Sequence, residues 1–199
     1  LAPLVGAVLA GVLGTQFGGN WIGRRASHSL TILGVLLSFV LSAMTLVSVV
    51  VDGARFNETL YTWMVVGGLK MEIGFLVDGL TAMMICVVTF VPLMVHLYSI
   101  CSLKDEAGYN RFFAYISLFT FAMLMLVMSN NMLQLFFGWE AVGLVSYLLI
   151  GFWYNKPSAI FANMKAFLVN RVGDFGFILG IGLIVAYAGT LNYAEAFAK

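Results

Sequence analysis

Long apolar segments are the feature that most limits what this chain can become. A helix needs about 20 apolar residues, rising 1.5 Å each, to cross the roughly 30 Å hydrocarbon core of a membrane. Such segments cover most of the 199 residues. We therefore predict an all-α, polytopic membrane bundle with about six transmembrane helices, at Leu1–Phe17, Leu30–Val51, Leu80–Ile100, Phe112–Met128, Met132–Trp153 and Ile160–Tyr187.

The composition supports a membrane protein and excludes several other classes. Hydrophobic residues make up 62% of the chain, charged residues 10%, and the mean hydropathy is +1.00. Soluble domains carry about 25% charged residues, and disordered chains are poor in apolar residues. The formal charge of +1 gives no basic field, so we expect no nucleic-acid partner. Cys86 and Cys101 lie 15 residues apart without any CxxC pairing, so with the two histidines we expect no four-ligand zinc site, iron–sulfur cluster or disulfide framework.

One stretch differs from the apolar segments around it. Residues 52–79 hold several charges and a Gly67-Gly68 pair between short β-prone runs, which favours a small extramembrane β-hairpin. The chain then divides into helices 1–2 at residues 1–51, the hairpin segment at 52–79, and helices 3–6 at 80–199. We interpret the last part as the start of an incomplete channel module.

The distribution of basic residues predicts the orientation. Five lysines and arginines lie in the loops after the first, third and fifth segments, against three on the opposite side, and positive loops favour the inner face. The hairpin and the N-terminus are therefore expected outside. The inner set is Arg24, Arg25, Lys104, Arg111 and Lys156; the outer set is Arg55, Lys70 and Lys199.

Four charged residues lie inside the predicted spans, where each costs about 2.5–3.5 kcal/mol at the membrane centre. They are Glu140 in the fifth span and Lys165, Arg171 and Asp174 in the sixth. Counted from the short loop at residues 155–157, Glu140 and Asp174 lie at similar depth, about 16 and 17 residues away. Arg171 and Asp174, three residues apart, are placed to pair on one helix face. Lys165 lies nearer the inner face, so its partner is either Glu140, bridged through water, or a group on another part of the protein.

Buried ionisable groups in membranes usually mark proton or ion pathways. Burial raises the pKa of a carboxylate and lowers that of a lysine, so opening and closing an ion pair switches the proton affinity of both groups. Arginine keeps its proton, which makes Arg171 a fixed charge that tunes Asp174. His96 in the third span is a candidate relay. The alternative for these residues is structural: ion pairs that hold helices together, and a hydrogen-bonded interface histidine.

Three stretches carry a family pattern. They read YNRFFAYISLFTFAMLMLVMSNNMLQLFFGWEAVGLVSYLLIGFWY at residues 109–154, MKAFLVNRVGDFGF at 164–177 and LVDGLTAMM at 76–84. In them the chain resembles the antiporter-like subunits of respiratory complex I called subunit L in bacteria and subunit 5 in mitochondria, over their N-terminal third. The stretch SICSLKDEAG at residues 99–108 departs from the SxGYM pattern of that family.

The resemblance implies a proton-translocating subunit in the membrane arm of an NADH:quinone oxidoreductase. Glu140 matches the essential glutamate of the fifth helix, whose lysine partner on the seventh helix lies beyond Lys199. Lys165, Arg171 and Asp174 match sixth-helix positions that modulate this pair and contact the neighbouring antiporter-like subunit. No redox centre is expected in this chain, because NADH, FMN, iron–sulfur clusters and quinone belong to partner subunits.

The same resemblance implies a multi-pass protein of the bacterial inner membrane, or of the mitochondrial inner membrane in a eukaryote. Two alternatives remain open. One is the large subunit of a multisubunit Na⁺/H⁺ antiporter, where FWELTS is usual in place of GWEAVGL at residues 138–144. The other is a structural membrane scaffold whose ion pairs only fasten helices.

Overall fold

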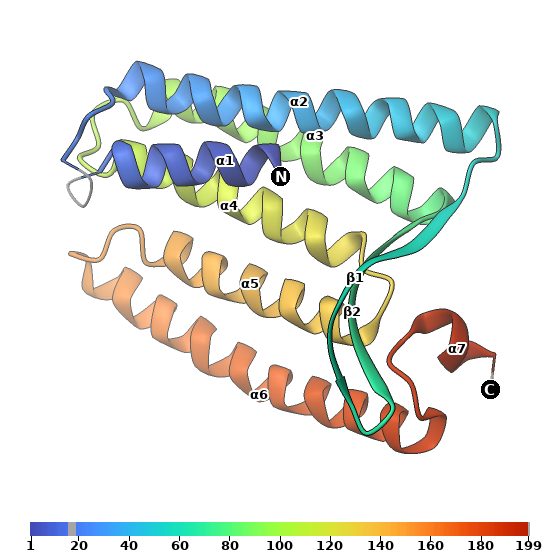
Figure 1. Ribbon diagram of the computed structural model, residues 1–199. Coiled ribbons are helices and arrows are strands. Elements are labelled where there is room, and N and C mark those ends of the chain that lie inside the picture. Colours follow the sequence, from blue (N-terminus) through green and yellow to red (C-terminus); the bar gives the residue numbers. More distant parts are fainter. Residues whose placement is uncertain (16–18, 199) are drawn as a thin grey trace.

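Five long apolar helices dominate the computed structural model, which describes residues 1–15 and 19–198 (Figure 1). Each has the length and hydropathy needed to cross a membrane. A two-stranded hairpin lies between the first two of them, as predicted, and a short helix α7, Tyr193–Phe197, follows the last. The chain is thus a multi-pass helical membrane protein. The five helices are α2 Arg24–Val51, α3 Gly79–Ser102, α4 Tyr109–Val127, α5 Met132–Ile150 and α6 Pro157–Ala188.

Five of the six predicted spans form long helices, and the first predicted segment forms a shorter apolar helix within the described residues. The first segment forms α1, Ala2–Val8, which continues into a π-helical turn η1, Leu9–Leu13. The helix ends where the side chains of Thr15 and Asn110 bind backbone carbonyls, at Gly11 (2.6 Å) and Gly14 (2.6 Å). These bonds replace a further helical turn. The predicted end at Phe17 lies outside the described residues.

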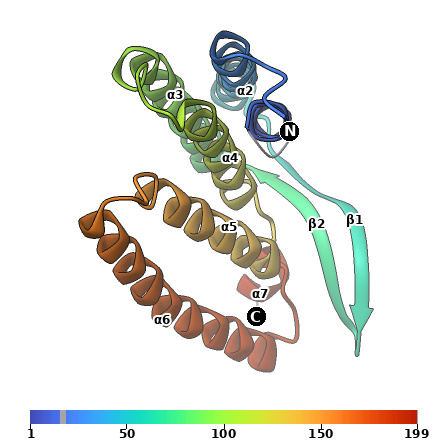
Figure 2. The same cartoon turned by 90° about the vertical axis from the view of Figure 1, so that its left-hand side faces the viewer.

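The helices form two groups. Helices α1 to α4 pack together, and α5 and α6 form a pair that joins them through the contact of α5 with α4 (Figure 2). The buried face of α2 carries small hydroxyl residues, and the Thr31 hydroxyl donates to the Ser27 carbonyl at 3.2 Å. Small residues of this kind let membrane helices approach closely.

The hairpin links the two groups at one end of the bundle. Strands β1, Phe56–Val66, and β2, Leu69–Val77, pair antiparallel. Both residues of the Gly67-Gly68 turn have positive φ, 59° and 89°, which glycine adopts without strain. The Gly74 amide donates to the Gln134 side chain at 3.0 Å, so β2 is fastened to the first turns of α5.

Helix α3 begins directly after β2 with a strong N-terminal cap. The Asp78 carboxylate accepts a hydrogen bond from the Thr81 amide at 2.8 Å. This bond, which the charged form accepts, lowers the pKa of Asp78 from its ordinary value of 3.8. Its contribution to stability is therefore complete above that value and is lost as the pH falls through the lower pKa of the folded state.

Gly138 provides a test of the contact between α4 and α5. A Cβ at Gly138 would lie 2.7 Å from the backbone Cα of Leu126, whereas among the described residues a Cβ at Gly143 would meet nothing within 4 Å. We predict that Gly138→Ala lowers the free energy of unfolding by about 1–3 kcal/mol, because backbone cannot move aside as a side chain does. Equilibrium unfolding in detergent measures this.

Gly143→Ala on the same helix is the matched control, and it should raise the free energy of unfolding by up to about 1 kcal/mol, because alanine favours a helix more than glycine does and a Cβ there meets no other atom of the described residues within 4 Å. Equal changes in both variants would show that the close contact with Leu126 does not set the effect.

Candidate functional site: an intramembrane charge cluster

The local structure of α5 and α6 places their charges at matching depth. The Asn131 side chain caps α5 by accepting from the Gln134 amide at 2.8 Å, and α6 begins with Pro157, where a missing N–H costs nothing. The short connection between the helices makes them antiparallel neighbours. Residues equally distant from this connection therefore face each other.

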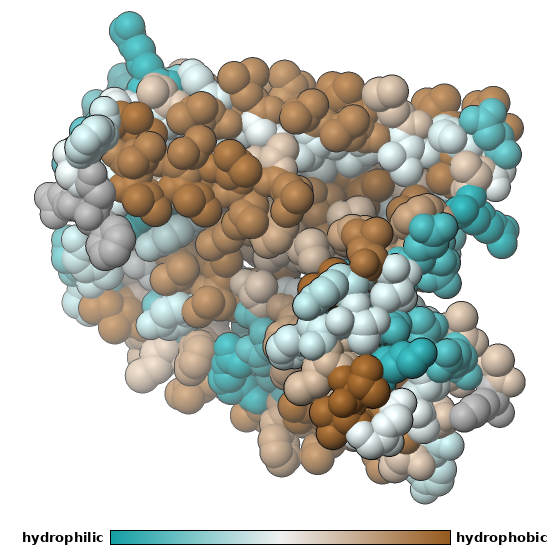
Figure 3. Space-filling view, viewed as in Figure 1, coloured by the Kyte–Doolittle hydropathy of each residue, from teal (hydrophilic) through white to brown (hydrophobic). Residues whose placement is uncertain are grey.

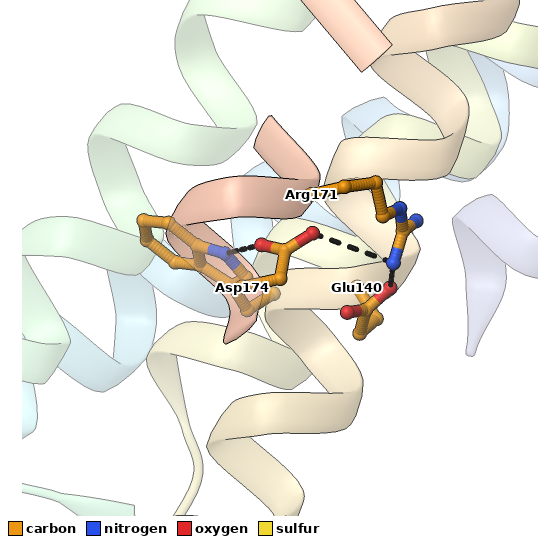
Figure 4. A network of polar contacts seen from close by, with 4 residues as sticks. Glu140, Arg171 and Asp174 are labelled. Carbon is orange, nitrogen blue, oxygen red and sulfur yellow. Dashed lines mark hydrogen bonds and ion pairs between the residues drawn. The ribbon is translucent and has the colours of Figure 1, made fainter. Parts of the chain in front are cut away.

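Arg171 bridges two carboxylates, one on each helix (Figure 4). Its Nη1 donates to Oε2 of Glu140 on α5 and lies 3.3 Å from Oδ2 of Asp174, three residues along α6. The predicted Arg171–Asp174 pair is confirmed. The resemblance implies a partner for Glu140 beyond Lys199, and the structure adds a partner within the chain, because the long arginine side chain spans the gap between the helices.

Trp139 completes the cluster, and the sequence interpretation missed its role. Its indole Nε1 donates to Oδ1 of Asp174 at 2.7 Å. Its ring packs edge to face with the Phe177 ring, with 5.6 Å between the two ring centres. A tryptophan deep in a span needs an acceptor for its N–H group, and this need was the available signal. Asp174 is thus held by an indole on one oxygen and a guanidinium on the other.

The cluster is one positive charge short. It contains two carboxylates and one guanidinium. The Asp174 side chain is nearly buried, with an exposed fraction of 10%, whereas Glu140 and Arg171 are partly exposed, at 25% and 37%. An unbalanced charge in an apolar layer is costly unless a cation or a proton balances it. The arrangement therefore favours the approach of a further cation.

The other two predicted residues lie elsewhere. Lys165 is exposed on α6, about two turns before Arg171, and makes no ion pair with any described residue. His96 is fully buried on α3, where its ring meets Phe113 of α4. Its Nδ1 lies 2.7 Å from the Pro92 carbonyl, so it carries the proton, and Nε2 has no partner among the described residues.

Potential metal ligands are scattered. No group of three or more histidine, cysteine or acidic side chains that could hold a metal ion occurs in the described ranges. Cys86 and Cys101 are both free thiols.

The fold and the cluster define a class: a multi-pass helical membrane protein with ionisable residues inside its bundle. Two family descriptions match the chain. "NADH-Ubiquinone oxidoreductase (complex I), chain 5 N-terminus" matches residues 63–113, and "NADH:quinone oxidoreductase/Mrp antiporter, TM" matches residues 129–198. The second match contains the whole charge cluster.

Curated relatives agree with these matches. NADH-quinone oxidoreductase subunit L of Neisseria meningitidis serogroup B is 61% identical over 100% of this chain, and that of Rickettsia typhi is 43% identical over 99%. NADH-ubiquinone oxidoreductase chain 5 of Dictyostelium discoideum is 39% identical over 99%. This chain belongs to the family of NADH-quinone oxidoreductase subunit L and chain 5, and it spans 29% of the length of each of these relatives.

A solved structure supports the fold alone. The structure of the membrane-bound sulfane sulfur reductase, an archaeal respiratory membrane complex, contains a chain that matches with a TM-score of 0.82 at 22% identity. The match covers 98% of this chain and 38% of that one.

Arg171 gives a direct test of the cluster. We predict that Arg171→Ala lowers the free energy of unfolding by about 1.5–3 kcal/mol, the range for a hydrogen bond to a charged group, because both carboxylates lose their cation. The partial exposure of Arg171 favours the lower end. Lys165→Ala, which removes a cation without an ion pair from the same helix, should change it by less than about 0.5 kcal/mol. Indistinguishable losses would contradict the cluster.

Proposed function

We propose that this chain is part of a proton-translocating membrane subunit that couples NADH:quinone electron transfer to proton movement. The observation that supports this proposal is the cluster of Glu140, Arg171 and Asp174, which holds two acids and one base inside the membrane-spanning helices. A carboxylate in such a cluster exchanges a proton when a neighbouring cation approaches or leaves. The relatives' name, NADH-quinone oxidoreductase, supplies the coupled reaction.

In the proposed mechanism Glu140 carries the proton. While Arg171 donates to it, Glu140 is stabilised in its charged form; when Arg171 turns toward Asp174, the charged form loses its partner and Glu140 takes up a proton. The hydrogen bond from Trp139 keeps the Asp174 carboxylate in place, where it can accept from Arg171 instead of Glu140. Arg171 itself stays charged throughout.

Two further residues have supporting roles in this proposal. Lys165 lies about 9 Å along α6 from Arg171, given a rise of 1.5 Å per residue, and acts on the cluster as a movable positive charge. His96 acts as a relay through the free acceptor at Nε2. The lysine that the family resemblance implies on the seventh helix, beyond Lys199, would balance the excess negative charge of the cluster.

The proposal includes location and partners. The protein works in the bacterial inner membrane or in the mitochondrial inner membrane, beside other membrane subunits of complex I and a neighbouring antiporter-like subunit. NADH, FMN, iron–sulfur clusters and quinone are bound by partner subunits. Residues 80–199 form the start of the channel module.

One other function has an observation in its favour. The family description that matches residues 129–198 also names Mrp antiporters, so exchange of sodium for protons is the second candidate. Its test is sodium dependence of proton movement in proteoliposomes that contain the full-length protein and its complex.

Glu140→Gln tests the proposed carrier, because glutamine keeps the size of the side chain and cannot release a proton. We predict at least a tenfold loss of NADH-driven proton translocation in the assembled complex, measured with a pH-sensitive dye in vesicles. Glu58→Gln on the exposed hairpin is the control and should pump normally. Normal pumping by Glu140→Gln would reject the carrier, and failed assembly with normal pumping per complex would favour the scaffold alternative.

Lys165→Ala tests the supporting cation. A nearby positive charge stabilises the charged form of a carboxylate, so its removal raises the proton affinity of the cluster. We predict that the alkaline limb of the pH profile of pumping moves to higher pH, and that Lys165→Arg restores the original profile. An unchanged profile in the alanine variant would assign Lys165 a structural role.

A further inference from the structure

A cavity of about 820 Å³ opens at the end of the bundle opposite the hairpin, where the segments after η1, α3 and α5 meet. Three cations lie in its wall, Arg24, Arg111 and Lys156, with Glu106 as the one acid. The lining therefore carries an excess of two positive charges. This cavity plays no part in the proposed proton pathway.

The three cations are held in place by carbonyls and aromatic rings. Arg24 donates to the Glu106 carbonyl at 3.1 Å, and Arg111 donates to the Phe152 carbonyl at 3.0 Å. The guanidinium of Arg111 also lies 5.2 Å from the centre of the Phe152 ring, and Lys156 lies 5.0 Å from that of Trp153. Such contacts fix the groups without neutralising their charge.

No described carboxylate neutralises these cations. The ion pairs of the described residues all belong to the Glu140 cluster, and the Glu106 carboxylate accepts instead from the Trp153 indole at 3.2 Å. The cavity thus has three fixed cations whose positive charge is not neutralised by an ion pair, and such groups can bind an anion.

The helix ends add to this positive potential. Helices α2, α4 and α6 begin at the cavity, with N-cap residues Gly23, Gly108 and Lys156 that supply no side-chain cap, and none of the three has an acid in its first turn. The first amides of a helix and its dipole favour an anion. Three such helix ends and three cations line the same cavity.

We propose that this cavity binds the phosphate group of an anionic phospholipid. It lies where the spans end, on the face that the lysine and arginine distribution predicts to be inside, and Trp153 in its wall is of the type found at headgroup level. Guanidinium and ammonium groups recognise phosphate oxygens, as Arg24, Arg111 and Lys156 are placed to do. A lipid headgroup is the phosphate source that this location supplies at high concentration.

The test uses the full-length protein, with any subunits that co-purify, in nanodiscs of phosphatidylcholine with about 20% phosphatidylglycerol. This mixture carries about one charge per five lipids, which is enough to reveal a preference of the protein for the anionic lipid. Native mass spectrometry counts the lipids retained. We expect the wild type to retain phosphatidylglycerol. The double variant Arg111→Gln/Lys156→Gln should retain at least five-fold less of it. Arg111→Lys/Lys156→Arg, which conserves charge, should retain it.

Two controls separate lipid binding at the cavity from general charge attraction and from binding of a soluble anion. Lys70→Gln removes a cation at the hairpin and should leave retention unchanged. Inorganic phosphate at millimolar concentration should not displace the lipid. Equal retention in all variants would overturn the proposal, and so would displacement by phosphate, which would identify a soluble anion. Crosslinking of an acidic segment of another subunit to Lys156 would assign the cavity to a protein partner and overturn it as well.

Discussion

The sharing of one guanidinium by two carboxylates is the interaction on which the site depends. Arg171 reaches Glu140 on α5 and Asp174 on its own helix, so the same side chain links α5 to α6 and sets the electrostatics of the site. Inside an apolar layer neither acid can remain charged cheaply without it. The resulting deficit of one positive charge favours a further cation that approaches from elsewhere.

The rest of the fold holds this pair of helices in register. At one end the hairpin crosses from the first helix group to α5, where Gly74 and Gln134 are bonded, and an isolated bridge joins Asn131 to Asn192 beyond α6. At the other end the loops converge on the cationic cavity. Much of the apolar surface lies open over the described residues, as the space-filling view shows for one face (Figure 3). These surfaces suit lipid or further helices.

Sequence reasoning found the helices and the charged positions because both have strong physical signals. Long apolar runs predict spans, and the symmetric distances of Glu140 and Asp174 from the loop predict their common depth. It failed where three-dimensional contacts decide. The early end of the first helix depends on bonds from Thr15 and Asn110, and the partner of Glu140 depends on how α5 and α6 lean together. The bond from Trp139 to Asp174 likewise requires a rotamer that no spacing rule specifies.

A double-mutant cycle on Glu140 and Arg171 tests the central claim most directly. The free energy of unfolding is measured for the wild type, Glu140→Gln, Arg171→Gln and the double variant, in the full-length protein in detergent. Groups in direct contact show interaction energies of about 0.5–3 kcal/mol, and we predict a favourable coupling within that range. Strictly additive losses would mean that the two side chains do not interact, and would contradict the shared guanidinium from which the proposed proton exchange follows.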